Sequence, residues 1–221
     1  MTPAMNTVVQ PELEALRPDG VTNQMQRFRL GGDTVSDDIV DRGLELMDCS
    51  PAAVAVGLTS DAGRGGVAML ARRCDELEQA LGVPVCNASV ADHDALRFLG
   101  AERIAVVTPF SPEVDQVVKQ NFVDAGFDVV AITGTDAPTL PAICETPIAE
   151  IEAVFDRVAG TAGIEAICQV GTALPVVGLL GSLEAASPVP IVACNAAVYW
   201  QTLRRVGVDD PIPGHGELLT R

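Results

Sequence analysis

The chain has 221 residues, of which 48% are hydrophobic and 20% charged. This composition is typical of a globular protein with a sizeable core and excludes an intrinsically disordered chain. The 30 acidic residues outnumber the 14 basic ones and give a formal net charge of −16, which disfavours nucleic acid and anionic membranes as partners.

Predicted strands and helices alternate along the chain. Strands are expected over residues 25–30, 52–57, 83–86, 103–108, 127–132, 164–170 and 189–193. Helices are expected over residues 8–16, 34–48, 64–81, 89–99, 112–125, 147–160, 173–185 and 195–206. Several strands are apolar throughout, as in parallel strands that are covered on both faces. The pattern predicts an α/β fold with parallel sheets.

Four segments of the first half recur in the second half in roughly the same order. The clearest pair is Val83–Val90 and Val189–Val198, and another is Val56–Ser60 and Gln169–Ala173. A duplicated half-domain would explain these recurrences. The sequence therefore predicts two pseudo-symmetric, flavodoxin-like lobes with parallel sheets.

The expected lobes share the chain unequally. Lobe 1 comprises residues 1–100 and the C-terminal segment 195–221, and lobe 2 comprises residues 101–194. We expect the two lobes to pack closely around a cleft that holds the functional site.

The duplication also predicts that lobe 1 lacks its opening strand. In the second half, Thr108-Pro109 follows the strand at 103–107, whereas the matching Thr2-Pro3 follows Met1 alone. A gap is therefore expected in the first sheet.

Parallel sheets bind ligands at the carboxyl ends of their strands, where helix N-termini point amides at anions. The residues at the predicted strand ends are rich in hydroxyls and amides and include no charged side chain. They include Asn6, Thr59, Ser60, Phe110, Thr172 and Asn195. Such donors could hold a carboxylate by hydrogen bonds. Equally, these residue types cap helices and form turns at every such junction.

The six cysteines are scattered without C-x-x-C spacing. Together with the absence of a signal peptide pattern and of a long apolar run, this predicts reduced thiols in a cytoplasmic protein, with no disulfide bond and no metal site. Cys168 lies within a predicted strand, and Cys194 ends another strand beside Asn195. A helix N-terminus could lower the pKa of the Cys194 thiol. Both are catalytic candidates, and simple packing is the alternative role of each.

The two histidines and one glycine-rich stretch carry weaker signals. His93 lies in the middle of a predicted helix and is expected to face solvent. His215 lies in the C-terminal tail, which could fold over the cleft. Gly63–Gly66 lacks the spacing of either phosphate-binding loop, so no nucleotide is expected.

Four motifs together carry a family resemblance. Residues 2–12 contain N-T-V-V-x-P-E, residues 57–60 read G-L-T-S, residues 170–172 read V-G-T, and residues 213–218 read P-G-H-G-E-L. Over nearly the whole chain these segments resemble the aspartate/glutamate/hydantoin racemase superfamily, in the branch of maleate cis–trans isomerase and arylmalonate decarboxylase. The resemblance implies two α/β lobes, a site between them and no cofactor.

The resemblance also implies roles for single residues. Asn6 matches an asparagine that binds the substrate carboxylate, and the groups that would hold carboxylates further include Thr59, Ser60, Gly171 and Thr172.

The chain departs from the family at the expected catalytic positions. Leu58 stands where the family has its first catalytic cysteine. The second position reads Val170 or, in another register, Cys168. Phe110 replaces a tyrosine that usually contacts the substrate. These changes make a racemase reaction with two thiols improbable.

Three functions remain open. The first is a cofactor-independent isomerase, similar to maleate cis–trans isomerase, which acts on a small carboxylate or dicarboxylate by thiol and acid–base chemistry. The second is a lyase similar to arylmalonate decarboxylase, a branch that uses one cysteine and holds its product carboxylate with Thr-Ser and backbone amides. The third is a carboxylate-binding protein without turnover. The expected partner is a small carboxylate, and a homo-oligomer is compatible with the sequence.

Overall fold

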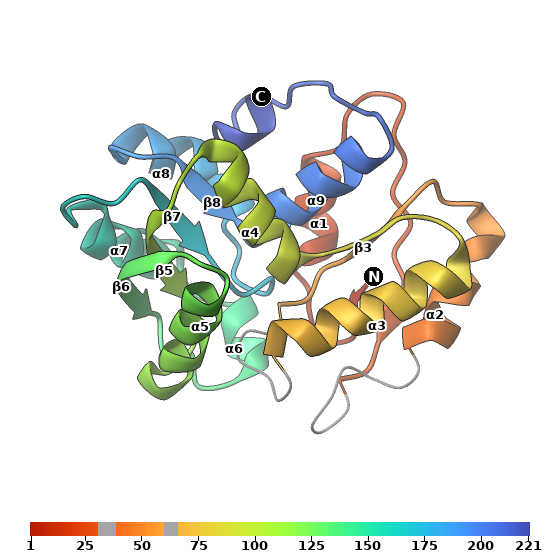
Figure 1. The fold of residues 1–221 in the computed structure, drawn as a ribbon, viewed down its shortest axis with the longest axis horizontal. Helices are drawn as coiled ribbons and strands as arrows, with labels where there is room; N and C mark the ends of the chain where they lie inside the picture. Colours follow the sequence, from red (N-terminus) through yellow and green to blue (C-terminus); the bar gives the residue numbers. More distant parts are fainter. Residues whose placement is uncertain (31–38, 60–65) are drawn as a thin grey trace.

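The computed structural model describes residues 1–30, 39–59 and 66–221 (Figure 1). The strands are β1 (Thr2–Pro3), β2 (Arg27–Phe28), β3 (Val54–Val56), β4 (Val85–Asn87), β5 (Arg103–Thr108), β6 (Asp128–Gly134), β7 (Ala166–Gln169) and β8 (Ile191–Ala193). The α-helices are α1 (Val9–Ala15), α2 (Ile39–Leu46), α3 (Gly66–Leu81), α4 (Ala88–Leu99), α5 (Pro112–Asp124), α6 (Leu140–Cys144), α7 (Ile148–Ala159), α8 (Leu180–Ala186) and α9 (Cys194–Arg205). Short 3-10 helices are η1 (Met47–Cys49), η2 (Val177–Leu179) and η3 (Leu218–Thr220). The predicted α/β class is confirmed.

The second half of the chain forms a four-stranded parallel sheet in the order β6-β5-β7-β8. Its central strand β5 is buried from Ile104 to Thr108. An apolar strand of this kind is stable where helices cover both faces of a sheet, because no side chain then needs to meet water.

The first half repeats this strand order with a shorter central strand. β1 pairs with β2, and β3 pairs with β4, both in parallel. The main-chain nitrogen of Met1 donates to the Ala55 carbonyl at 2.6 Å, and the Gly57 nitrogen donates to the Met1 carbonyl at 2.8 Å. These bonds join the two pairs in the order β2-β1-β3-β4. The strand that the duplication predicts to be missing is represented by two residues only.

A groove of about 760 Å³ lies beside the short strand. It is lined by Met1, by residues 22–25, by residues 52–55 and by parts of α1 and α9. The groove therefore lies beside the start of β1, between the segments of chain that lead into β2 and β3.

Helices α4 and α9 pack against each other in the middle of the molecule (Figure 1). The four-stranded sheet with α5 and α7 lies on one side of this pair, and α2 and α3 lie on the other. Ala88, Ala91 and Ala95 of α4 are fully buried, and such small side chains allow close approach of helices. None of the described helices is long and apolar enough to cross a membrane. The division of the chain into two lobes at residues 100/101 and 194/195 stays a prediction.

The helix predicted over residues 173–185 is wrong at its start. The chain there forms turns before η2 and α8. The ring of Pro175 disfavours the α-helical conformation of the preceding Leu174, so the helix begins later. Conversely, the sequence reading missed the short helix α6. Two predicted helices begin at residues 34–38 and 64–65, which lie outside the described residues.

His93 does not face solvent as the sequence predicts. Its side chain is 7% exposed and packs against Phe122 and Phe127, with ring centroids 5.0 and 5.7 Å away. The Nε2 atom is buried without a hydrogen-bond partner among the described residues. Burial lowers the pKa of His93 from 6.5 to about 4, because the charged form loses its water.

We expect stability to fall when His93 is forced to ionise. Between the unfolded pKa of 6.5 and the folded pKa of about 4, the unfolded chain binds the proton more tightly, so stability decreases as pH falls. From pH 7 to pH 5 the loss should be about 2 kcal/mol. Urea unfolding of wild type and His93→Leu across this range measures it, and parallel profiles would contradict the assignment.

Candidate functional site

Three strand ends from both halves of the chain meet at one point. The Asn6 side-chain nitrogen donates to the Thr172 hydroxyl at 3.2 Å, and this hydroxyl donates to the Gly57 carbonyl at 3.2 Å. Asn6 follows β1, Gly57 follows β3 and Thr172 follows β7. We call Asn6, Gly57 and Thr172 the strand-end cluster. The predicted approach of Asn6 to Thr172 is confirmed, whereas their role in binding stays a prediction.

Asn6 is held rigidly in this cluster. It is 1% exposed, and its Oδ1 accepts from the main-chain nitrogens of Val8 at 2.9 Å and Val9 at 3.1 Å, which caps α1. Arg27 donates to the Asn6 carbonyl at 2.5 Å. The bond to Thr172 uses one N–H of the side chain. The other N–H has no acceptor among the described residues.

Phe110 lies beside the turn that follows β7. Gly171 has φ of +100°, and a Cβ atom at this glycine would lie 2.7 Å from the Pro109 ring and 3.7 Å from Phe110 Cζ. The Phe110 nitrogen donates to the Thr108 hydroxyl at 3.1 Å, and Thr108 in turn donates to Asp115. The ends of β5 and β7 are thereby packed together.

Two further candidates, Thr59 and Ser60, follow β3, and the structure describes only the first of them. Thr59 is half-buried, two residues beyond Gly57. Ser60 lies outside the described residues. Leu58, at the position where the resemblance expects a cysteine, is half-buried and packs against the core of the first half.

The two candidate catalytic cysteines are both fully buried. Cys168 points from β7 into the core and is 0% exposed. Cys194, the first residue of α9, is also 0% exposed, and its Sγ lies 3.7 Å from Gln169 Oε1. A thiol needs access to its substrate, so this burial disfavours a catalytic role for either residue.

Asn195 lies behind the strand-end cluster rather than in it. Its side-chain nitrogen donates to the Thr172 carbonyl at 2.9 Å and to Glu12 Oε2 at 2.6 Å. Asn195 Oδ1 is buried without a partner among the described residues. Asn195 therefore supports Thr172 from the protein interior.

Glu12 is a buried carboxyl that the sequence reading did not select. It extends from α1, and its Oε1 accepts from the Val177 nitrogen at 2.8 Å. Burial raises the pKa of Glu12 to about 7, although hydrogen bonds from Asn195 and Val177 favour the ionised form. The sequence signal that could have identified Glu12 is a single glutamate on the core face of a predicted helix. Glu12 joins α1 to the loop after Thr172.

The C-terminal tail packs beside this loop. His215 Nδ1 lies 3.3 Å from the Val177 carbonyl, and the Glu217 nitrogen donates to Glu184 of α8 at 2.7 Å. The tail predicted to fold over the cleft thus packs against η2 and α8.

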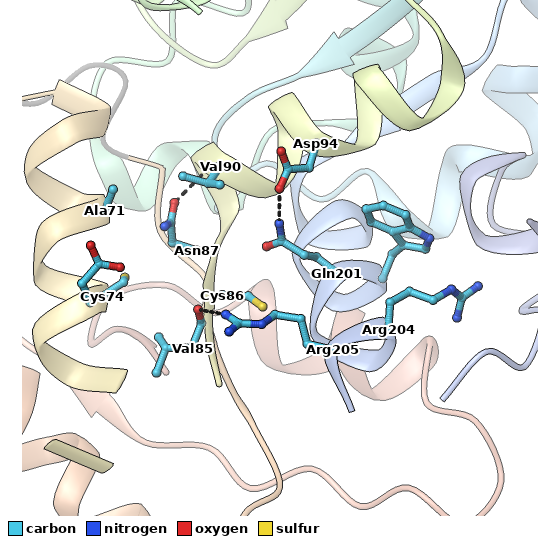
Figure 2. Close-up of a pocket in the computed structure, with 12 residues that line it drawn as sticks. Ala71, Cys74, Val85, Cys86, Asn87, Val90, Asp94, Gln201, Arg204 and Arg205 are labelled. Carbon is cyan, nitrogen blue, oxygen red and sulfur yellow. Dashed lines mark hydrogen bonds between the residues drawn. The ribbon is translucent and has the colours of Figure 1, made fainter. Parts of the chain in front are cut away.

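A cavity of about 570 Å³ lies between α3, β4, α4 and α9 (Figure 2). Three of its four charged lining residues, Asp94, Arg204 and Arg205, have hydrogen-bond partners. Arg205 donates to Glu78 and to the Val85 carbonyl, and Asp94 accepts from Gln201 at 2.6 Å. The described residues that line this cavity and the groove beside β1 do not include any member of the strand-end cluster. Nor do the described residues contain a cluster of three or more His, Cys, Asp and Glu side chains that could hold a metal ion.

A comparison with known protein families shows to which family the chain belongs. The family model described as arylmalonate decarboxylase matches residues 6–219. The chain belongs to the arylmalonate decarboxylase family. The match includes the strand-end cluster and the loop that Glu12 contacts.

Individual members of this family and their relatives show moderate similarity. Arylmalonate decarboxylase of Bordetella bronchiseptica is 26% identical over 201 residues, which cover 86% of this chain and 80% of that protein. Maleate isomerase of Pseudomonas putida is 24% identical over 100% of this chain and 95% of that protein. The crystal structure of the maleate isomerase Iso from Pseudomonas putida S16 superimposes with a TM-score of 0.85 at 21% identity, covering 99% of this chain and 96% of that one. The predicted branch is thereby confirmed, and its members named here are decarboxylases and isomerases.

Proposed function

We propose that the protein is a cofactor-independent lyase that removes one carboxylate from a small malonate-type dicarboxylate. The observation that carries the proposal is the chemistry of the strand ends. The neutral polar side chains of Asn6 and Thr172 stand there together with apolar side chains, among them Leu58 and Phe110, while the candidate thiols are buried. Membership of the arylmalonate decarboxylase family supports the same substrate class.

The two carboxylates of such a substrate would meet different surroundings. One accepts hydrogen bonds from the free N–H of Asn6 and from the Thr59 hydroxyl. The other lies against Leu58 and Phe110, where it loses hydrating water. Loss of that water favours departure of the charged group as neutral CO2.

The reaction needs no nucleophile from the protein. The bond between the α-carbon and the departing carboxylate breaks, CO2 leaves, and the electron pair passes into the retained carboxylate as an enediolate. Hydrogen-bond donors that face this carboxylate stabilise the added charge. Water then gives a proton to the α-carbon and leaves as hydroxide, so that the dianion and one water become a monocarboxylate, CO2 and hydroxide.

Two other functions are less well supported. Cis–trans isomerisation of maleate, as in the maleate isomerases, needs a thiol that adds to the double bond. Leu58 stands at the first position where the family resemblance places a thiol, and the second reads Val170 or, in the other register, the fully buried Cys168. Binding without turnover is favoured by the same observations, since neither Leu58 nor Val170 is an acid or a base and Cys168 is buried. It is the second candidate.

One assay separates the three functions. The protein is incubated with phenylmalonate and, separately, with maleate, while CO2 and fumarate are measured and binding is followed by calorimetry. We expect CO2 from phenylmalonate and no fumarate from maleate. Fumarate would establish the isomerase, binding without either product would establish the binding protein, and no binding would contradict all three.

A matched pair of variants tests the site itself. Asn6→Asp keeps the oxygen that caps α1 but replaces the N–H donor with negative charge, so phenylmalonate affinity should fall at least about tenfold. Asn87→Asp is the control, because Asn87 Oδ1 caps α4 through the Val90 nitrogen outside the strand-end cluster. Equal loss in both variants would contradict the assignment of Asn6.

A further inference from the structure

Gln169 is a polar side chain buried beneath the turn that carries Gly171 and Thr172. It ends β7 and is 1% exposed, in a strand whose other residues are apolar. Its Nε2 donates to the Val170 carbonyl at 2.8 Å and to the Gly171 carbonyl at 3.0 Å. A single amide group therefore holds two successive carbonyls of the main chain.

This arrangement fixes the direction of two main-chain N–H groups. A trans peptide is planar, with its C=O and the following N–H pointing in opposite directions. Since the carbonyls of Val170 and Gly171 both point at Gln169, the N–H groups of Gly171 and Thr172 both point away from it.

Neither of these N–H groups has an acceptor within the part of the chain that the structure describes. By contrast, the nitrogen of the preceding Val170 still donates to the Val107 carbonyl at 2.9 Å, as a member of the sheet. Sheet pairing thus ends at Val170, and two adjacent amides follow with free hydrogens. Successive N–H groups of this kind form a site for an oxygen anion.

Cys194 lies at the oxygen end of the Gln169 amide. Its Sγ lies 3.7 Å from Gln169 Oε1, so the thiol donates to the oxygen and leaves Nε2 facing the carbonyls. With the amide reversed, Gln169 Oε1 would oppose the carbonyl oxygens of Val170 and Gly171. Orienting Gln169 is a function that the buried thiol could have without contact with the substrate.

We propose that Gln169 is a positioning residue that aims the amides of Gly171 and Thr172 at the substrate carboxylate, and that Cys194 orients Gln169. The inference rests on the proposed carboxylate site and deepens it. Gln169, inside the protein, would thus stabilise the enediolate indirectly. Charge that develops on the retained carboxylate would meet two N–H groups that are already aligned.

The test uses phenylacetate, a monocarboxylate that binds without turnover, and follows the amide protons by NMR. In the wild type, the amide protons of Gly171 and Thr172 should shift downfield as phenylacetate saturates the site. In Gln169→Met, which keeps the length but loses the donors, affinity should fall about tenfold or more and both shifts should shrink. Gln201→Met is the control, since Gln201 pairs with Asp94 of α4 at the cavity between α3, β4, α4 and α9.

Cys194→Ala separates positioning from catalysis. A positioning role predicts weaker phenylacetate binding, by a smaller factor than in Gln169→Met. Loss of CO2 release with unchanged phenylacetate affinity would instead make Cys194 a catalytic acid and overturn its assigned role.

The outcomes separate this inference from the proposed function. Phenylacetate binding to the wild type without shifts at both amides overturns the inference, even if CO2 is released and Gln169→Met does not fold. Binding with both shifts but without CO2 release from phenylmalonate upholds the inference and contradicts the lyase. Absence of phenylacetate binding overturns the inference, and absence of CO2 release from phenylmalonate in addition contradicts the lyase.

Discussion

Replacing Gly171 with alanine should destabilise the protein by about 2–4 kcal/mol and abolish carboxylate binding. Two effects add at this position. The φ of +100° is unfavourable for any residue with a Cβ atom, and that atom would lie 2.7 Å from the ring of Pro109. The proline ring cannot rotate away as a flexible side chain would. The turn must therefore move, and the amides of Gly171 and Thr172 move with it.

A second glycine provides the control. Gly126 has a similar φ of +95°, but a Cβ atom there would meet nothing within 4 Å. Gly126→Ala should thus lose only about 1 kcal/mol from backbone strain and should keep its affinity for phenylacetate. Urea unfolding and calorimetry measure both variants. Equal destabilisation by the two substitutions would show that the contact with Pro109 is unimportant.

Ionisation of Glu12 should make the folded protein less stable as pH rises. Burial raises its pKa from 4.5 to about 7, so between these values the native state binds the proton more tightly than the unfolded chain. Stability is therefore highest below pH 4.5 with respect to this group, and it is lost as pH rises to about 7 and above. The whole effect is about 3 kcal/mol.

Comparison with Glu12→Gln isolates this effect, because the variant cannot ionise. As pH rises from 4.5 to 8, the free energy of unfolding of the variant should increase relative to that of the wild type by about 3 kcal/mol. Glu14→Gln controls for the removal of one negative charge from an exposed position on α1. Since His93 acts in the opposite direction over an overlapping range, only differences between variant and wild type are informative. Parallel profiles for Glu12→Gln and wild type would refute the assignment.

Much of the fold could be predicted because its signals are local. Apolar strands and amphipathic helices are visible in any short window of sequence, and eight of the nine α-helices among the described residues overlap a predicted helix. The repeats predicted two similar halves with parallel sheets, and the structure shows equivalent strand orders in the two halves. The predicted start of a helix at residue 173 is too early, because the prediction gave the apolar periodicity more weight than the proline at position 175.

The candidate site could be predicted less completely. Placing Asn6, Phe110 and Thr172 at strand ends followed from the rule that ligands bind where parallel strands end. Glu12 and Gln169 were missed, since neither stands at a strand end that opens to solvent and both act from the interior. The orientation of Cys194 toward Gln169 is a side-chain contact between two elements, which periodicity does not encode.

The sequence by itself determined the α/β class, the similarity of the two halves, the family and the presence of Leu58 where the family has its first catalytic cysteine. These are properties of residue identity and local pattern. Only the tertiary structure decided that Asn6 meets Thr172 across 166 positions and that Glu12 meets Asn195 across 183. It also decided that Cys168 and Cys194 are inaccessible. Contacts and burial of this kind depend on how the two sheets and the α4–α9 pair pack, because packing removes water and brings distant residues together.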